Sequence, residues 1–443
     1  MRRARQLRNK WTPWGVTASL IVALSLVTTV IVVSMHHKVS GGVGVVIHVQ
    51  PTVSLLDQPV QVRIFHLPPK QLVSITLTSI DALGRTWVST ARFESGSQGE
   101  INLATTPSLG GSYTGVQPMG IVSSMKPMAG QSGNYAYWWA ASSAQDFHLS
   151  VGISGQEVAS ATFQRLGSAP GVTVTAETLA AQGFIGQFWM PPPGMVRRPA
   201  ILEFGGSEGG LDGGVLGADL ASAGYPTLDI AYFKEPGLPQ TLSRIPLEYF
   251  ARALTWLSTQ PGVDRQQIYV LGISRGSEAA LLLGVHYPAL VHGVIAAVPN
   301  DAALCSYPGC TGPAWTLNGQ PLPYTTQFDN PSPTDNPQAI IPVEEIQGPI
   351  FLVCGGADRV WDSCVFADAI MSRLAAHHDP YEHVLYAYAS AGHGVGMIAP
   401  YEPDQLLPAL VDLTGSVPDA NHLADATLWP KLLAFLADTT GTP

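Results

Sequence analysis

Apolar and polar residues alternate in short runs through the first third of the chain. Residues 60–65 and 72–77 place an apolar side chain at every second position, which is the period of a strand with one buried face. Turn-forming glycines, prolines and aspartates separate such runs, and no stretch of about ten residues there has the period of a helix. We therefore predict an antiparallel β-sandwich over residues 43–165.

The pattern changes near residue 173, where continuous apolar runs begin to alternate with segments of helical period. The runs are of the buried-strand type and lie at residues 200–204, 227–231, 268–271, 294–298 and 350–353. Residues 246–259 carry large apolar side chains at helical spacing before Pro261 and Gly262 end the pattern. We predict a mostly parallel sheet covered by helices over residues 173–440, interrupted by an inserted lid over about 299–342.

The amino-terminal residues 1–40 carry the charge pattern of a targeting segment. Positively charged residues precede an uncharged stretch; they are Arg2, Arg3, Arg5, Arg8 and Lys10. A helix over residues 14–35 would rise about 33 Å, enough to cross the hydrocarbon core of a bilayer. The charge bias predicts a membrane anchor with its basic end in the cytoplasm and the catalytic domain outside. Two alternatives stay open: a cleaved signal peptide, so that the protein is secreted, and a helix buried in the globule.

Composition and charge exclude several classes of function. The 443 residues carry a formal net charge of -10, which argues against a nucleic-acid-binding protein. The cysteines are too few for a scaffold built on disulfides, and no spacing of cysteine and histidine fits a zinc site. Cys305 and Cys310 could pair if the domain is exported, whereas Cys354 is interpreted as a small core residue and Cys364 has no special role. No metal or redox cofactor is expected.

A G-x-S-x-G motif over residues 272–276 lies directly after one buried strand and before a predicted helix over residues 277–286. Glycines at this junction allow a sharp strand-to-helix turn that exposes a serine hydroxyl above the edge of the sheet. Ser274 is therefore the candidate nucleophile, although a serine here could also serve only as a helix cap. The amide of Arg275 would lie at the amino end of the helix, where it can stabilise an oxyanion.

A serine nucleophile needs a base, and the base needs an orienting carboxylate, here expected in the chain order serine, acid, histidine. His393 follows the strand-like residues 384–388 in a loop of small residues and is the candidate base. Asp358 follows the strand at 350–354 and is the candidate acid, with Asp362 as its rival. A structural loop histidine and a solvated surface carboxylate are the plainer interpretations of these residues.

A second oxyanion donor is expected from the glycine-rich loop over residues 205–211, which follows the strand at 200–204. Glycine would let the backbone approach a substrate closely, so the amide of Gly206 or Ser207 is the candidate donor. An ordinary flexible loop would have the same composition. Only 12% of the residues are charged, which would suit an acyl-chain pocket beneath the predicted lid and would equally suit a plain core.

The chain resembles the acyl-CoA thioesterase/bile acid-CoA:amino acid N-acyltransferase family over roughly residues 50–410. The resemblance rests on residues 67–69, 109–113, 118–120, 245–250, 272–276, 342–346 and 391–393, and on the spacing of Asp358, Trp361 and Ser363. It implies an immunoglobulin-like β-sandwich followed by an α/β-hydrolase domain, with Ser274, His393 and Asp358 as the catalytic triad. In this family thioesterases carry serine at the nucleophile position and amino-acid-conjugating members carry cysteine, so Ser274 implies the thioesterase activity.

We therefore expect a serine acyl hydrolase that cleaves fatty acyl-CoA thioesters through an acyl-enzyme intermediate. Export conflicts with this substrate, because CoA thioesters are not expected outside a membrane; an external carboxylesterase or lipase-like enzyme is an alternative. An acyltransferase that passes the acyl group to an amine or alcohol would use the same residues, and a non-catalytic binding module is the remaining class. The expected partners are an acyl thioester or ester substrate and the membrane, without nucleic acid, and no oligomeric state is assigned.

Overall fold

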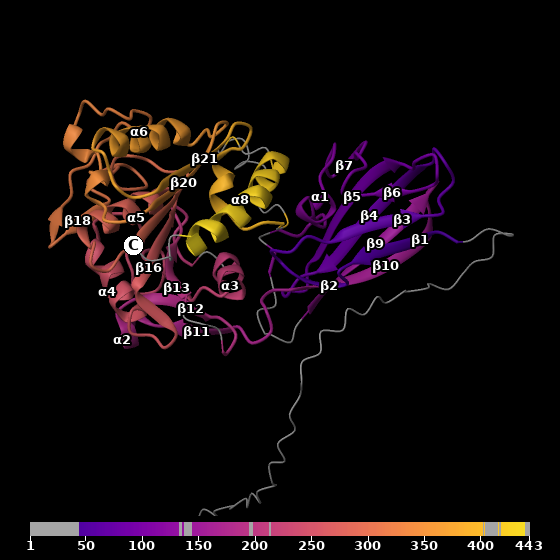
Figure 1. Cartoon of the computed structure of the whole chain (residues 1–443), viewed down its shortest axis with the longest axis horizontal. Helices are drawn as coiled ribbons and strands as arrows, with labels where there is room; N and C mark the ends of the chain where they lie inside the picture. Colours follow the sequence, from indigo (N-terminus) through magenta and orange to yellow (C-terminus); the bar gives the residue numbers. More distant parts are fainter. Residues whose placement is uncertain are drawn as a thin grey trace, which may run out of the picture. The chain divides into compact units, whose positions relative to one another are not determined.

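The computed structural model describes residues 44–132, 135–136, 144–194, 198–211, 214–401, 403, 415 and 418–438 (Figure 1). The predicted anchor over residues 1–40 lies outside these ranges. Within them, no helix combines the length and the apolar character that a membrane crossing requires. Along the described chain, a region built mainly of strands is followed by a region in which strands alternate with helices.

The first region contains two sheets of mainly antiparallel strands. The larger sheet has the strand order β2-β10-β9-β4-β5-β7, with β8 paired to β5. Its strands are β2 (Val53–Leu55), β4 (Leu72–Ile80), β5 (Thr86–Glu94), β7 (Gly110–Gly111), β8 (Lys126–Pro127), β9 (Ala144–Ile153) and β10 (Gln156–Leu166). The smaller sheet has the order β1-β3-β6, with β1 (Val46–Gln50), β3 (Gln61–Phe65) and β6 (Ile101–Asn102). A short helix, α1 (Gly120–Ser123), lies between β7 and β8 in the chain.

Alternation along these strands places one set of side chains in a shared core. In β4, Val73, Ile75 and Leu77 are buried while their neighbours are more exposed, as the sequence period predicts. The same buried cluster includes Val62 and Ile64 of β3, so side chains of both sheets pack against one another. Burial of each large aliphatic side chain stabilises the fold by about 1.5–3 kcal/mol. The assignment of this region to the immunoglobulin-like class stays a prediction.

The second region is organised around an eight-stranded sheet with the order β11-β12-β14-β13-β16-β17-β20-β21. From β14 to β21 neighbouring strands are parallel, whereas β12 runs antiparallel to both β11 and β14. The strands are β11 (Thr173–Glu177), β12 (Ile185–Met190), β13 (Arg198–Phe204), β14 (Thr227–Ala231), β16 (Val263–Ile273), β17 (Gly293–Ala297), β20 (Ile350–Gly355) and β21 (His383–Tyr388). The mostly parallel sheet predicted from the apolar runs is confirmed.

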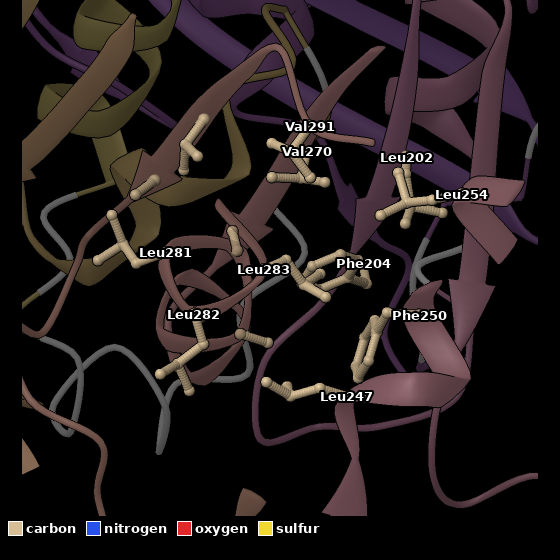
Figure 2. Close-up of a cluster of buried hydrophobic side chains, with 14 of the residues drawn as sticks. Leu202, Phe204, Leu247, Phe250, Leu254, Val270, Leu281, Leu282, Leu283 and Val291 are labelled. Atoms are coloured by element: carbon tan, nitrogen blue, oxygen red, sulfur yellow. The ribbon is translucent and has the colours of Figure 1, made fainter. Parts of the chain in front are cut away.

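Helices cover both faces of this sheet (Figure 1). The described helices are α2 (Leu179–Gln182), α3 (Val215–Ser222), α4 (Leu247–Leu257), α5 (Arg275–His286), α6 (Ser363–Ala376) and α8 (Pro418–Asp438). One buried cluster joins α4 and α5 to strand residues such as Leu202 and Val270 (Figure 2) and also includes residues of α6. Another joins α3 and α8 to Ile201 and Leu271. Because successive strand residues face opposite sides, side chains at adjacent positions of β13 and β16 pack into different clusters. The sheet is therefore buried on both faces, which explains its continuous apolar runs.

The predicted helix over residues 246–259 is α4, and it buries the predicted side. The apolar residues that set its period are each 0% exposed and belong to one buried cluster; they are Leu247, Phe250 and Leu254, labelled in Figure 2, and Leu257. The helix predicted over residues 277–286 is α5, which begins earlier, at Arg275. Ser274 thus stands immediately before the helix, and the last two residues of the motif belong to the first turn of α5.

The inserted segment over residues 299–342 is partly built into the fold. Its short strands β18 (Trp315–Leu317) and β19 (Gln320–Pro321) form a small sheet with β15 (Ile245–Pro246). Short 3-10 helices follow as η1 (Pro337–Ala339) and η2 (Val343–Glu345). Ala303 and Trp315 belong to the same buried cluster as α4. Side chains of this segment are therefore part of the core, and its action as a lid stays a prediction.

The cysteines of the chain form two disulfides. Cys305 bonds to Cys310, a pairing that the sequence leaves open. Cys354 is a buried core residue, as expected, but it also bonds to Cys364, a pairing that the sequence analysis does not include. Their Cα atoms lie 5.0 Å apart because the chain turns back between the end of β20 and the start of α6, which sequence spacing alone does not reveal.

Asp301, which follows β17, is a buried carboxyl group. The residue is 5% exposed, and its Oδ1 atom has no hydrogen-bond partner among the described residues. Burial raises the pKa of Asp301 to about 7, although the charge of Arg373 opposes the shift. The folded state therefore binds this proton more tightly than the unfolded chain does. The stability that the group contributes is present below about pH 4 and is lost as the pH rises through about 7.

We expect Asp301→Asn, which stays neutral, to become progressively more stable than the unmodified protein as the pH rises. Between about pH 5 and about pH 8, the difference in the free energy of unfolding should shift by about 3 kcal/mol in favour of the variant. Urea unfolding followed by tryptophan fluorescence measures this difference. Asp329→Asn, at an exposed position of the same segment, should show no such shift. A difference for Asp301→Asn that does not change with pH would contradict the account.

Candidate active site

Ser274 occupies a strained turn between β16 and α5. Its backbone has φ 56° and ψ -121°, a conformation that a residue with a side chain rarely adopts and that costs about 1–3 kcal/mol. A Cβ atom on Gly272 would lie 2.2 Å from the carbonyl oxygen of Gly276, and one on Gly276 would lie 2.4 Å from that of Gly205. Only glycine fits at these positions of the motif, because backbone segments approach one another so closely. The turn presents the Ser274 hydroxyl beyond the end of β16.

The Ser274 hydroxyl begins a chain of hydrogen bonds that runs through His393 to Asp358. Ser274 Oγ lies 2.9 Å from Nε2 of His393, and Nδ1 of the same ring lies 2.7 Å from Oδ2 of Asp358. Because a carboxylate only accepts, Nδ1–H donates to Asp358 and Nε2 is left to accept the hydroxyl proton. The side chain of Asp358 is 0% exposed and that of His393 is 13% exposed. The structure thus brings together the three residues that the sequence singles out.

His393 and Asp358 come from neighbouring loops at one edge of the sheet. His393 begins η3 (His393–Met397), which follows β21, and Asp358 follows β20. The amide of Ala357 donates to the carbonyl of Ala391 at 2.9 Å, and this bond joins the two loops. Since the carboxyl ends of parallel strands meet at the same edge, the residues after β16, β20 and β21 converge there.

Asp362, the alternative acid, has a different role in the structure. Its side chain caps α6 by accepting the amide of Val365 at 3.4 Å. Asp358 instead directs Oδ2 at the imidazole, while its Oδ1 accepts the amide of Val360 at 2.9 Å. The geometry therefore favours Asp358 over Asp362 as the partner of the histidine.

Trp361 packs against His393, a contact that the sequence analysis does not assign. The two rings meet edge to face, with centroids 5.2 Å apart and planes at 88°. The indole Nε1 donates to the carbonyl of Val298 at 3.1 Å, which fixes the tryptophan ring. This packing limits the movement of the imidazole ring toward the side that the indole occupies. A tryptophan three positions after the candidate acid is the one signal of this contact in the sequence.

The candidate oxyanion donors lie close to the nucleophile. Arg275 is the first residue of α5, where helix geometry leaves the amide without an intrahelical partner. A Cβ atom on Gly206 would lie 2.8 Å from Cβ of Ser274, so the glycine-rich loop approaches the nucleophile directly. The amide of Gly206, however, donates to Oε1 of Glu208. Ser207 lies in the same loop and is partly exposed.

A buried tyrosine holds this loop in place. The hydroxyl of Tyr232 lies 3.0 Å from the carbonyl oxygens of both Gly205 and Gly206 and shares its proton between them. Burial raises the pKa of Tyr232 well above its usual value, so the hydroxyl stays protonated and remains a donor. Lys234 Nζ donates to the backbone carbonyl of Glu208 at 2.7 Å. The backbone of the loop is therefore fixed by side chains that follow β14.

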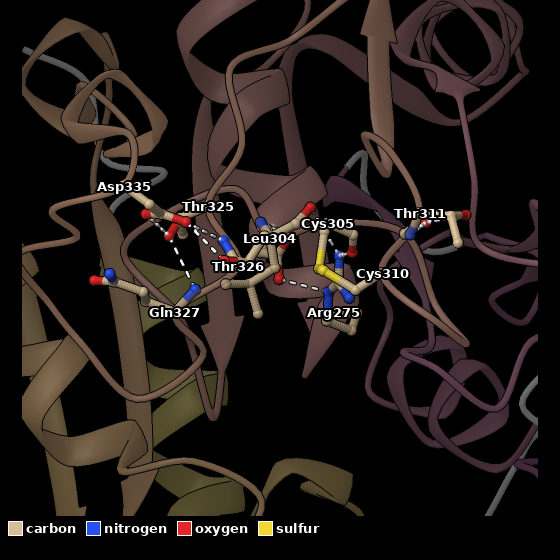
Figure 3. The surroundings of a disulfide bond; sticks show 11 residues. Arg275, Leu304, Cys305, Cys310, Thr311, Thr325, Thr326, Gln327 and Asp335 are labelled. Atoms are coloured by element: carbon tan, nitrogen blue, oxygen red, sulfur yellow. Dashed lines mark hydrogen bonds and ion pairs between the residues drawn. A yellow bond between two sulfur atoms is a disulfide. The ribbon is translucent and has the colours of Figure 1, made fainter.

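The side chain of Arg275 forms a buried ion pair that the sequence analysis does not predict. Arg275 Nε lies 2.6 Å from Oε1 of Glu278, and the two side chains are 1% and 0% exposed. Burial raises the pKa of Glu278, and the guanidinium opposes that rise. Arg275 also donates to the carbonyls of Leu304 and Cys305, at 3.2 and 2.8 Å (Figure 3), while Glu278 accepts the indole N–H of Trp315 at 2.9 Å. The pair ties the first turn of α5 to the inserted segment.

The sheet and the site together define an α/β-hydrolase fold. The nucleophile stands in a sharp strand–turn–helix junction after a parallel strand, and the acid and the histidine follow later strands in the order serine, acid, histidine. The α/β-hydrolase domain that the family resemblance implies is confirmed.

Comparisons with known proteins find relatives that match most of the chain. Acyl-coenzyme A thioesterase 6 of Mus musculus is 29% identical over 404 residues, which cover 86% of this chain and 93% of the relative. Acyl-coenzyme A amino acid N-acyltransferase 1 of Mus musculus is 30% identical over 376 residues, which cover 80% of this chain and 86% of the relative. A solved α/β-hydrolase enzyme from a Medee basin deep-sea metagenome library is similar with a TM-score of 0.39 and 17% identity, over 60% of this chain and 99% of that chain.

Two family models also match the chain. Residues 57–178 match the acyl-CoA thioester hydrolase/BAAT N-terminal region, and residues 245–306 and 314–442 match the BAAT/acyl-CoA thioester hydrolase C terminal. These matches cover more than half of the sequence and confirm the resemblance drawn from the motifs. The chain belongs to the acyl-CoA thioester hydrolase/BAAT family.

Proposed function

We propose that this protein is a serine hydrolase that cleaves acyl-CoA thioesters, with Ser274 as the nucleophile, His393 as the base and Asp358 as the orienting acid. The observation that carries the proposal is the continuous hydrogen-bond chain that joins these three side chains at one edge of the sheet. Family membership supplies the substrate class, because relatives over most of the chain are named acyl-CoA thioesterases.

In the proposed reaction, His393 Nε2 takes the hydroxyl proton as Ser274 Oγ attacks the acyl carbonyl carbon. The carbonyl oxygen becomes an oxyanion, which the amide of Arg275 and a second amide, from Gly206 or Ser207, stabilise. The C–S bond then breaks, and the imidazolium gives its proton to the leaving thiolate. A water molecule, deprotonated by His393, attacks the ester on the serine, and collapse of the second tetrahedral intermediate releases the carboxylic acid and restores the enzyme.

The choice between hydrolysis and acyl transfer depends on what attacks the acyl-enzyme. The relatives include both proteins named thioesterases and proteins named N-acyltransferases. An oxygen ester on Ser274 reacts less readily with amines than a thioester on a cysteine would, and this difference favours water. We therefore propose hydrolysis as the main reaction and treat acyl transfer as an outcome that the assay can detect.

A second candidate function, an esterase that acts outside the cytoplasm, is favoured by the disulfides. All four cysteines of the chain are paired, and disulfides persist mainly in oxidising compartments. The predicted anchor, with the catalytic domain outside, would place the site where CoA thioesters are not expected. The same three residues would then cleave an oxygen ester or an acylated carrier of the cell envelope.

The first test of the proposal is whether turnover depends on Ser274. We expect the full chain to release thiol from acyl-CoAs, assayed over short, medium and long acyl chains beside a nitrophenyl ester series. Ser274→Ala should lower kcat/KM by at least about 10³-fold, because the members of a triad act as a unit. An added amino acid serves as the probe for acyl transfer.

The outcomes of this assay separate the candidates. Ser274-dependent cleavage of nitrophenyl esters without cleavage of any acyl-CoA would assign the external esterase. Amide formation from the added amino acid at the expense of free acid would assign an acyltransferase. Undiminished turnover in Ser274→Ala would overturn all three candidate functions, the thioesterase, the external esterase and the acyltransferase.

The two aspartates after β20 offer a matched pair of variants. Asp358→Asn should lower kcat by about 10²–10⁴-fold, because an amide at this position can stabilise the wrong imidazole tautomer and cannot balance the imidazolium. Asp362→Asn keeps a side chain that caps helices well, so kcat should stay within about twofold of the unmodified protein. Steady-state kinetics with one acyl-CoA compare the two variants, and the reverse ranking would contradict the assignment.

Glu208 competes for one proposed oxyanion donor. Its carboxylate accepts a hydrogen bond from the Gly206 amide. This bond must break before the amide can donate to a substrate oxygen. Glu208→Ala frees the amide and removes a negative charge beside the forming oxyanion, so kcat/KM should rise by about three- to tenfold for this exposed side chain. Glu208→Gln keeps an acceptor of the same shape and should gain less. A fall in kcat/KM for both variants would show that Glu208 supports the site instead of blocking it.

A further inference from the structure

The Cys354–Cys364 disulfide closes a short loop that contains the proposed acid. Cys354 lies in β20 and is 0% exposed, while Cys364 lies in the first turn of α6, and the sequence separation between them is 10. Asp358 and Trp361 both lie inside this loop, and both contact His393. The disulfide therefore joins the two ends of the segment that surrounds the imidazole on this side.

The two halves of the loop are held in different ways. In the first half, the amide of Gly356 donates to the carbonyl of Tyr388, at the end of β21, and the amide of Ala357 donates to that of Ala391, each at 2.9 Å. In the returning half, the amide of Gly355 reaches Ser363 Oγ at 3.3 Å, and Trp361 donates to the carbonyl of Val298. A 3.3 Å bond is long for an amide donor, so it constrains the start of α6 weakly. The disulfide is the covalent link that holds the start of α6 against the end of β20.

Asp358 must be held accurately if it is to orient the base. Its Oδ2 lies 2.7 Å from Nδ1 of His393, and a displacement of about 1 Å in an active site can lower the rate by about 10²-fold. A loop whose ends are not joined samples more conformations than a closed one. Opening the Cys354–Cys364 bond would therefore reduce the fraction of time that the carboxylate spends within hydrogen-bond distance of the imidazole.

We propose that Cys354 and Cys364 are positioning residues, whose disulfide holds Asp358 against His393 so that the enzyme reaches full activity only when this bond is oxidised. The inference rests on the proposed function, because the disulfide acts through the acid. Opening the bond is a two-electron reduction: a dithiol reductant is oxidised to its own disulfide, and the two sulfur atoms become thiols. Reoxidation forms the bond again and should restore the activity.

The other disulfide provides a contrast, because it lies near a different part of the site. The carbonyl of Cys305 accepts the side chain of Arg275 (Figure 3), and Arg275 also carries the proposed oxyanion amide. Loss of the Cys305–Cys310 bond would therefore act on the oxyanion side. Its effect should be independent of Asp358.

The experiment is a double-mutant cycle between the disulfide and the acid. It compares kcat and KM for thiol release by the unmodified chain, Cys354→Ala/Cys364→Ala, Asp358→Asn and the triple variant. The cysteine variant should lower kcat by about 10- to 100-fold with KM within about twofold. The triple variant should match Asp358→Asn within about twofold, because no acid is left to position.

The contrast variant is Cys305→Ala/Cys310→Ala in the same two backgrounds. Any factor by which it lowers kcat should multiply with the factor for Asp358→Asn, since the two changes act on different groups. If the Cys354–Cys364 disulfide merely stabilised the fold, its removal would likewise lower kcat by a factor that multiplies with that of Asp358→Asn. The cycle therefore separates a positioning role of Cys354 and Cys364 from a general structural one.

A second measurement keeps the inference testable if the cysteine variant does not fold. The unmodified protein is reduced with a dithiol, thiol labelling and mass mapping show when Cys354 and Cys364 are free, and circular dichroism shows that the fold persists. Turnover should fall as these thiols appear and return on reoxidation.

Full activity with both thiols labelled, or a further loss of kcat in the triple variant, overturns the inference. Ser274→Ala distinguishes the two failures: if it is active, the proposed function fails, and if it is inactive while the disulfide-free enzyme is fully active, this inference alone fails.

Discussion

The close approach of backbone segments at Ser274 is the constraint on which the site depends. A positive φ at this residue turns the chain sharply from β16 into α5, and glycine is required at Gly272 and Gly276 because a Cβ atom would collide with neighbouring carbonyls. The turn costs free energy, and the buried clusters on both faces of the sheet offset that cost. A hydroxyl held in this way needs no rearrangement before it meets the base.

The convergence of the remaining groups follows from the direction of the strands. The strands from β14 to β21 are parallel neighbours, so the loops that carry Ser274, Asp358 and His393 emerge at one edge. Links between segments then set their distances: the Ala357–Ala391 backbone bond on the acid side, and the bonds from the Arg275 side chain to the carbonyls of Leu304 and Cys305 on the oxyanion side. The site is held by contacts between segments that lie far apart in the sequence.

Local sequence patterns predict the elements of the second region and the residues that they carry. Continuous apolar runs locate the parallel strands, helical spacing locates α4 and its buried side, and the junction at Ser274 follows from glycines between a strand and a helix. The order of residues along the chain then singles out Asp358 and His393. Periodicity and chain order suffice here because each signal lies within one element or at its end.

Other features depend on tertiary contacts and leave no local signal. The bond between Cys354 and Cys364 requires the chain to turn back after β20, and the contact of Glu208 with the Gly206 amide depends on the path of one loop. The Arg275–Glu278 pair lies at helical spacing, but its burial under the inserted segment is a property of the fold. The anchor predicted over residues 1–40 lies outside the described residues, and the immunoglobulin-like class of the first region stays a prediction.

The proposed reaction depends on one covalent bond, the acyl ester on Ser274. Mixing the full chain with an acyl-CoA, quenching in acid within the first turnover and mapping peptides by mass spectrometry tests that claim. We expect a peptide containing Ser274 that has gained the mass of the acyl group, formed together with one equivalent of free CoA. Turnover without any acylated intermediate, or an acyl group on a different residue, would contradict it.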